Sequence, residues 1–442
     1  MTASRFSLSR RRLLGTGAAT FGLVAAPHVR RASADDATTL RIGAILPIGG
    51  TAVPVAGDNR RAVGEAARMG LLLGEQEYAR NAQLLGRDLH VVVANAPNAD
   101  AAHRAAQRLV SRDGVSVLLG GFSLEEALAI GEVAEEHGVL FLNIGAVSDA
   151  LRTAACRSQT FHVEASAAMY LDAIVGWFVR AGHRTWHFVQ EDSKEGNALY
   201  ERTLKVLTDR HWGGREAGRS LVEPGGRDFE ATVRDIRSSA PDVVLVLTDW
   251  LAQLDFLARY ETERLPHPVT GLPEPAAQLR DFFATSRRVA PQAGLGHRAM
   301  LWEATLDAYG ARELNDRFQS RWGRPMDPPA WTAYQSVKIA FEAGMFGGSL
   351  DGRDLARHLT SELAIFDIHK GIGVSFRPWD HQLRQSLYLV QINPAEARGH
   401  TLAPKLARAS LVGELPAIYM PGTDPVERLD QLGDIRRGAA CA

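Results

Sequence analysis

RIGAIL at 41–46, LHVVVA at 89–94, VSVLL at 115–119 and VLFLN at 139–143 are the four stretches that decide the fold. Each is a short apolar run, and the segments between them carry apolar residues at the spacing of a helix face. The first such face consists of Ala62, Ala66, Met69 and Leu73. Strands that alternate with helices predict a parallel sheet covered by helices.

A second set of the same elements follows. Apolar runs at 185–190 and 242–248 predict strands, and helical patterning is found at 196–209, 229–238 and 251–263. The sequence therefore predicts a second α/β lobe.

The last third of the chain is less regular. Residues 266–299 are rich in Pro, Gly and Arg and support no assignment, whereas 300–304 predicts a strand and 306–346 is helical in pattern. Residues 375–390 predict two β segments around a turn. From Asn393 onward the chain is interrupted by Pro and Gly, which is typical of a tail.

The composition is that of a globular protein. The chain has 442 residues, of which 45% are hydrophobic and 23% are charged, so its length predicts two or three domains. Lys plus Arg number 50 against 51 Asp plus Glu, but six of the Arg lie in the first 34 residues, which contain no acid. The remainder has 44 basic and 51 acidic residues, a net charge of −7, so we expect no nucleic-acid partner.

The N-terminal segment is predicted to be an export signal. Arg10, Arg11 and Arg12 precede a mildly apolar stretch at 13–26, and the small residues at 32–34 form a cleavage site. The consecutive arginines indicate the twin-arginine type, with a mature protein that begins near residue 35 and is soluble in the periplasm. A membrane anchor is the alternative, but 14 residues fall short of the ~20 that span a bilayer.

The only cysteines are Cys156 and Cys441. In a protein exported to an oxidising compartment, a disulfide between them is the simplest hypothesis. Two unrelated free thiols remain the alternative.

Catalytic and metal-binding motifs are absent. The sequence has no Gly-x-Ser-x-Gly, no His-Glu-x-x-His and no Walker A loop, and its histidines show no ligand spacing on a helix. The acidic pair Glu125-Glu126 is interpreted as a solvated helix face that also favours the helix dipole. We therefore predict a protein that is not an enzyme and carries neither a cofactor nor a metal ion.

The remaining candidates for function are loops that follow predicted strands, because ligands of open α/β sheets bind outside the carboxyl ends of strands. After three strands of the first lobe come the loops 49–58, 120–125 and 145–149. Ser123 either caps the following helix or binds a polar ligand group, and Ser148 allows the same two interpretations.

Two loops of the second lobe carry similar chemistry. Residues 191–196, which include Glu195, follow one strand, and Thr248-Asp249-Trp250 follow another. The ring of Trp250 either stacks on a ligand or packs in the core.

Several of these stretches resemble a known family. Residues 42–47, the Gly120-Gly121 loop and residues 139–146 look like the extracellular solute-binding proteins of the leucine/isoleucine/valine-binding type, and the resemblance covers about 40–392. Four further strings are similar to a subgroup associated with quinoprotein (pyrroloquinoline quinone-dependent) alcohol dehydrogenase systems. They are 151–157, 314–318, 323–326 and, most distinctively, 375–385.

The resemblance implies a type I periplasmic binding protein with two Rossmann-like lobes. Three segments near 160–163, 299–304 and 371–376 would join the lobes as a hinge. The implied lobe 1 comprises 35–160 and 305–370. The implied lobe 2 comprises 161–300 and 371–392, and 393–442 form a C-terminal tail.

The resemblance also implies a ligand site between the lobes. In amino-acid-binding members, hydroxyls near the positions of Ser123 and Ser148 hold the substrate carboxylate, although Val147 stands here where Thr is usual. Glu195 occupies a common Tyr position, and Glu274 is the counterpart of the family acid. The ligand-binding residues predicted in this way are Phe122, Ser123, Ala146, Ser148, Glu195, Asp249, Trp250 and Glu274.

The expected function is the capture of a small polar molecule in the periplasm by a monomer that presents it to the permease and ATPase of an ABC transporter, with a link to alcohol oxidation. The alternative is an accessory or sensor protein of a quinoprotein alcohol dehydrogenase system, without a transported ligand.

Overall fold

The structure is a computed structural model that describes residues 38–49, 59–211, 213–371, 373–394, 401–416, 424–436 and 441. The predicted export signal and most of the predicted loop at 49–58 lie outside the described residues. Within the described residues, no helix combines the length and apolar character that crossing a membrane requires.

The first lobe is built on a parallel sheet, as predicted, but the sheet has five strands and only four of them were predicted; the fifth lies in the segment 160–163 that was expected to cross between the lobes. Its strand order is β2 (Asp88–Asn95), β1 (Thr39–Leu46), β3 (Val117–Gly120), β4 (Leu140–Asn143) and β5 (Thr160–His162). β1, β3 and β4 are buried on both faces almost throughout, which is why they contain so few polar residues, whereas β2 is an edge strand with exposed and half-buried positions.

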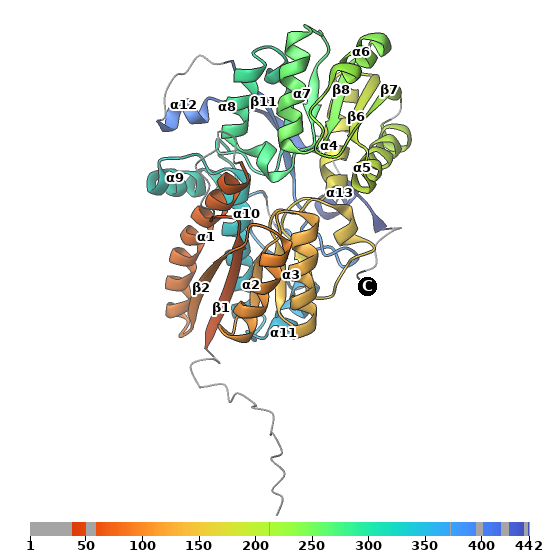
Figure 1. The fold of residues 1–442 in the computed structure, drawn as a ribbon. Helices are drawn as coiled ribbons and strands as arrows, with labels where there is room; N and C mark the ends of the chain where they lie inside the picture. The colour runs from red at the N-terminus through yellow and green to blue at the C-terminus, as the bar shows by residue number, and fades with distance from the viewer. Residues whose placement is uncertain are drawn as a thin grey trace, which may run out of the picture. The chain divides into compact units, whose positions relative to one another are not determined.

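Helices cover both faces of this sheet (Figure 1). α1 (Asn59–Leu84) and α10 (Pro328–Phe346) pack against each other on one face, and α2 (Ala99–Ser111) and α3 (Leu124–His137) form the other layer. Gly138 ends α3 with a φ of 66°, a left-handed conformation that glycine adopts without strain. The two further helices of this part of the chain are α9 (Ala311–Trp322) and α11 (Gly352–Leu359).

The second lobe contains a four-stranded parallel sheet with the order β7 (Arg215–Val222), β6 (Thr185–Glu191), β8 (Val243–Leu247) and β9 (Val269–Gly271). The sequence predicted β6 and β8 but missed the other two. β7 is a sheet edge with exposed and half-buried positions, so it lacks an apolar run, and β9 has only three residues.

Five α-helices surround the second sheet, and each follows or precedes one of its strands. They are α4 (Ala167–Arg180), α5 (Lys194–Lys205), α6 (Glu230–Ser239), α7 (Trp250–Thr262) and α8 (Arg280–Val289). The three predicted helices of this lobe are confirmed to within two residues at their starts. α5 ends four residues before the predicted boundary because the chain continues as a π-helical turn, Val206–Arg210.

A three-stranded antiparallel sheet corrects two expectations. Its order is β10 (His297–Met300), β11 (Leu387–Ile392) and β12 (Ala409–Leu415). The strand expected at 300–304 ends where it was predicted to begin. The predicted tail supplies β12, together with α12 (Leu402–Leu406) and α13 (Pro425–Gln431).

Residues 375–385 lie beside β5 and are joined to it by hydrogen bonds, and we call this contact the seam. Phe376 pairs with Leu383 around a turn, in agreement with the predicted turn, and the backbone N–H of Leu383 donates to the carbonyl of His162 at 2.9 Å. The buried Gln382 amide donates to the carbonyls of His162 (3.2 Å) and Glu164 (3.0 Å). Its oxygen accepts a 2.6 Å hydrogen bond from Nε of Arg152, which is also buried.

A second chain of hydrogen bonds joins the seam to the segment after β10. The hydroxyl of Tyr170 donates to Glu164 (2.7 Å) and accepts from the amide of Gln278 (2.9 Å). The oxygen of Gln278 accepts from the backbone N–H of Leu301 at 2.7 Å. Parts of all three segments predicted to cross between the lobes are therefore tied together by buried hydrogen bonds.

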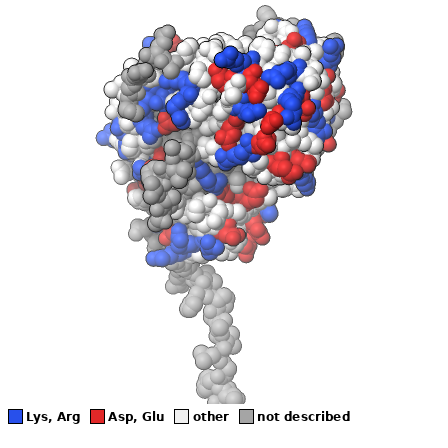
Figure 2. All heavy atoms as spheres, turned by 45° about the horizontal axis from the view of Figure 1, so that its top comes forward, with Lys and Arg blue, Asp and Glu red and all other residues white. Residues whose placement is uncertain are grey.

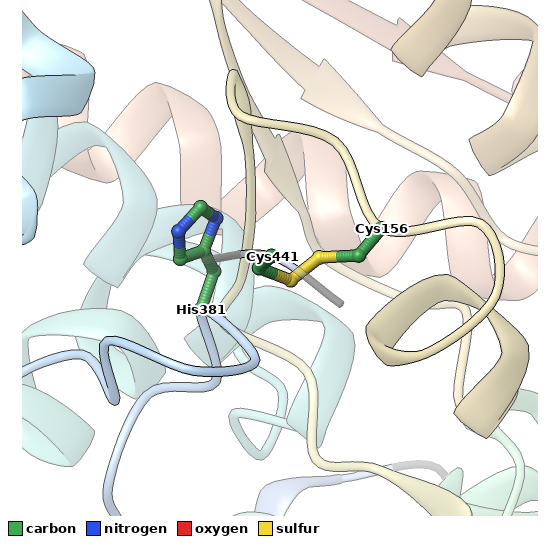
Figure 3. A group of neighbouring side chains, drawn as sticks. All are labelled: Cys156, His381 and Cys441. Atoms are coloured by element: carbon green, nitrogen blue, oxygen red, sulfur yellow. A yellow bond between two sulfur atoms is a disulfide. The ribbon is translucent and has the colours of Figure 1, made fainter. Parts of the chain in front are cut away.

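Cys156 and Cys441 form a disulfide, with a Cα–Cα distance of 5.2 Å (Figure 3). His381 lies beside it, and the ligand atoms of the three residues are within 4.8 Å of one another. Because paired sulfurs offer no thiolate, this group is not a metal site in the disulfide form.

Candidate ligand-binding site

A cavity of about 200 Å³ lies where the carboxyl ends of strands from both parallel sheets meet. The residues that follow β3 and β4 line it from the first lobe, and those that follow β6, β8 and β9 line it from the second lobe. Seven of the predicted ligand-binding residues belong to this lining. They are Phe122, Ser123, Ala146, Ser148, Glu195, Asp249 and Glu274.

Trp250 is placed differently from the prediction. It is not among the residues that line the cavity, and its half-buried side chain packs against the main hydrophobic core. Its backbone N–H instead donates a hydrogen bond to the carboxylate of Glu274. Trp250 is the first residue of α7, and its neighbour Asp249, the N-cap of that helix, lines the cavity.

Three helices begin at the cavity, and each is capped by a side chain in its wall. Ser123 accepts from the backbone N–H of Glu126 (3.3 Å) and caps α3, so its predicted capping role is confirmed. Ser193 caps α5 by accepting from Gly196 at 3.0 Å. Asp249 caps α7 by accepting from the N–H groups of Leu251 and Ala252.

The loop after β4 is held by Asn143, the last residue of that strand. Its side-chain oxygen accepts from the N–H groups of Gly145 (3.2 Å) and Ala146 (2.9 Å), and its amide donates to the Ala146 carbonyl (2.8 Å). Asn143 is fully buried, so these bonds fix the loop that carries Ser148.

The carboxyl groups of the cavity are electrostatically coupled. Burial raises the pKa of Glu274 to about 8, and the negative charge of Asp249 adds to the shift. Burial also raises the pKa of Glu195. A hydrogen bond from the Ser148 hydroxyl lowers this pKa and so offsets part of the shift. Because Ser148 follows β4 and Glu195 lies on α5, this contact bridges the two lobes.

Some lining residues were missed by sequence reasoning. Glu125 is exposed, as the interpretation of a solvated helix face requires, but it also lines the cavity, as does Glu191 at the end of β6. Both residues lie at or shortly after the end of a predicted strand, and this position in the sequence is typical of ligand-binding residues in open α/β sheets. Leu272 and Pro275 follow the short β9, which no sequence pattern revealed.

The interpretation of a solvated helix face is wrong for Glu126. This residue is buried, forms an ion pair with Arg60 and accepts a hydrogen bond from the N–H of Phe122.

The geometry described here, two α/β lobes with a cavity between the carboxyl ends of their strands, is that of a two-lobed binding protein. Residues 39–399 match the periplasmic binding protein family, so the chain belongs to that family.

Individual relatives are more distant. Leu/Ile/Val-binding protein homolog 7 of Brucella abortus (strain 2308) is 25% identical over 228 residues, which cover 48% of this chain and 52% of that protein. The chain thus matches about half the length of this relative.

Two crystal structures share the fold. An amino acid ABC transporter substrate-binding protein from Pseudomonas fluorescens Pf-5 superposes with a TM-score of 0.71 at 20% identity, covering 90% of this chain and 99% of that one. A branched-chain amino acid transporter substrate binding protein from Streptococcus pneumoniae, in complex with isoleucine, superposes with a TM-score of 0.67 at 16% identity, covering 85% and 99%.

Proposed function

We propose that this chain is the substrate-binding protein of an ABC transporter, which captures a small polar solute between its two lobes and delivers it unchanged to the permease and ATPase subunits. The observation that carries the proposal is the cavity at which five strand ends from two separate sheets converge. Membership in the periplasmic binding protein family supports the same function.

The size of the cavity limits the solute. A volume of about 200 Å³ is below the roughly 300–1,000 Å³ of pockets for drug-sized ligands. The solute is therefore a molecule of few heavy atoms. Closure of the lobes around it is a hinge motion whose axis we place at the seam of buried hydrogen bonds.

Calorimetric titration of the purified protein with amino acids, amines, polyols and small aromatic acids tests this function. We expect stoichiometric binding of at least one class, with the ligand recovered chemically unaltered. Turnover of a bound compound, or the absence of binding by any class, would contradict it.

We further propose that the protein acts in the periplasm after export by the twin-arginine route, as a monomer. The arginines at 10–12 support the route. Replacing all three by Lys should leave the precursor in the cytoplasm, as fractionation and immunoblotting would show. Normal export of the variant would exclude the twin-arginine route while leaving solute capture intact.

A second candidate function is an accessory role in a quinoprotein alcohol dehydrogenase system. The sequence string 375–385 favours it, although this string is largely buried in the seam and offers little surface for a partner. Co-purification of the exported protein with a quinoprotein dehydrogenase, without any bound solute, would support this role over transport.

A further inference from the structure

We propose that the solute is a small organic cation, a protonated amine that carries no carboxylate group. This inference rests on the proposed function, because it assigns a ligand class to the same cavity. It is carried by the charges and the hydrogen-bond donors of the cavity wall.

Every charged side chain in the described lining of the cavity is acidic. The lining contains five carboxyl groups and no Lys, Arg or His. The five are Glu125, Glu191, Glu195, Asp249 and Glu274.

The acidity is a property of the cavity and not of the surface in general. On the face seen in Figure 2, the side chains of Lys and Arg are interspersed with those of Asp and Glu. In the cavity, by contrast, the carboxyl group of Glu274 experiences the charges of Asp249, Glu195 and Glu191, all of the same sign. Such a site lacks a positive charge that a cationic ligand would supply.

The positive ends of the helix dipoles at the cavity do not neutralise its negative charge. Each of the N-termini of α3, α5 and α7 contributes about half a positive charge. Together they offset fewer than two of the carboxylates. The site therefore remains negative even when Glu274 is protonated.

Four backbone N–H groups at the cavity are already occupied by side chains of the protein. The N–H groups of Gly145 and Ala146 donate to Asn143, and that of Phe122 donates to Glu126 at 3.1 Å. The N–H of Trp250 donates to Glu274. A ligand carboxylate would therefore find these four amide donors engaged and would meet the negative charge of the acidic side chains.

A bare metal ion fits less well than an organic cation. Among the described residues, the one group of three His, Cys, Asp or Glu ligand atoms within 4.8 Å of each other is the disulfide pair with His381, which lies outside the cavity. No three of the carboxylates in the described lining have ligand atoms within 4.8 Å of one another. Apolar side chains between them, Phe122, Leu199, Leu247 and Leu272, provide surface for a hydrocarbon part of the ligand.

Matched pairs of compounds test the inference with the full mature protein. Titration calorimetry would compare isoamylamine with leucine, ethanolamine with serine, and putrescine with ornithine, since each pair differs by one carboxylate. We expect at least one amine to bind about tenfold or more tightly than its amino acid, and its affinity to fall as ionic strength rises.

Failure of the inference is distinguishable from failure of the proposed function. Tighter binding of the amino acids, or binding of benzoate or a neutral polyol alone, would overturn the cation class while supporting solute capture. No binding of any compound would overturn both.

Paired variants test whether the carboxylates of the cavity are responsible for amine binding. Glu125→Gln and Glu195→Gln should each weaken amine binding about 10- to 100-fold. The controls Glu132→Gln, on α3, and Glu201→Gln, on α5, replace exposed residues outside the cavity and should leave affinity unchanged. Equal effects of the cavity and control variants would overturn the inference.

Discussion

At the scale of single residues, Glu274 both lines the cavity and binds the first residue of α7. Its carboxylate accepts a hydrogen bond from the N–H of Trp250 at the start of α7, while the charged side chains that act on it, Asp249, Glu195 and Glu191, are all acids. Burial and these acids raise its pKa to about 8 from an ordinary value of 4.5. The folded chain therefore holds a proton at neutral pH that the unfolded chain has released.

This difference predicts how stability depends on pH. Between pH 4.5 and about 8 the folded state binds more protons at Glu274 than the unfolded state does, so this group lowers the free energy of unfolding as pH rises. Glu274→Gln removes the titration and keeps an oxygen for the Trp250 N–H. Thermal unfolding without ligand should show similar stability of both proteins at pH 5 and higher stability of the variant at pH 8.5.

The wild-type protein and the Glu274→Gln variant share all other titrating groups. The difference in stability between them at each pH therefore reports on Glu274 alone. A stability difference that is the same at pH 5 and pH 8.5 would contradict the raised pKa of Glu274.

At the scale of elements, the seam between β5 and the string 375–385 determines how the two lobes are joined. Arg152 and Gln382 are both fully buried and bond to each other and to the carbonyls of the chain that leaves β5. Buried polar groups of this kind are stable only when every partner is present.

Removing one hydrogen-bond partner from this buried network should therefore lower the free energy of unfolding. Gln382→Ala leaves the buried Nε of Arg152 without its hydrogen bond and removes one of the hydrogen bonds to each of the carbonyls of His162 and Glu164. We expect a loss of about 2–4 kcal/mol in the free energy of unfolding. Gln107→Ala on the exposed side of α2 is the matched control, with an expected change within about 0.5 kcal/mol. Urea denaturation of both variants measures the difference, and equal stabilities would contradict the role of the seam.

The elements also show what the sequence could predict. β1, β3, β4 and β8 were found because they are buried on both faces and form continuous apolar runs, and β2 was found from its apolar run although it is a half-exposed edge strand. Ser123, Ser148 and Asp249 were found because they follow such strands. β9, β12 and the cavity residues Leu272 and Pro275 were missed, since a strand of three residues and an exposed outer strand leave no periodic signal.

At the scale of the whole molecule, the C-terminal segment fastens distant parts of the chain. Arg377 donates to the carbonyls of Leu429 and Leu432, and the N–H of Gly433 donates to Asp172 on α4 at 2.6 Å. The disulfide then joins Cys441 to Cys156, 285 residues earlier. The supposed tail is thus bound to both the seam and the second lobe.

Loss of the disulfide should destabilise the protein without removing the cavity, because neither cysteine lines it. We expect the double variant Cys156→Ser/Cys441→Ser to lose about 2–4 kcal/mol in the free energy of unfolding. Denaturant titration measures this loss, and thiol labelling of the denatured wild-type protein should find no free cysteine. Two reactive thiols in the wild type would contradict the pairing.

The account as a whole depends on reversible capture of a small molecule between the lobes. Native mass spectrometry tests it most directly, with mature protein exposed to a small-molecule extract of the producing cells. We predict a mass increase equal to one small organic cation per chain, which is lost on denaturation and is absent from a Glu125→Gln/Glu195→Gln variant. A folded protein that acquires no such mass, or that binds the same amount when these two carboxylates are replaced, would contradict the account.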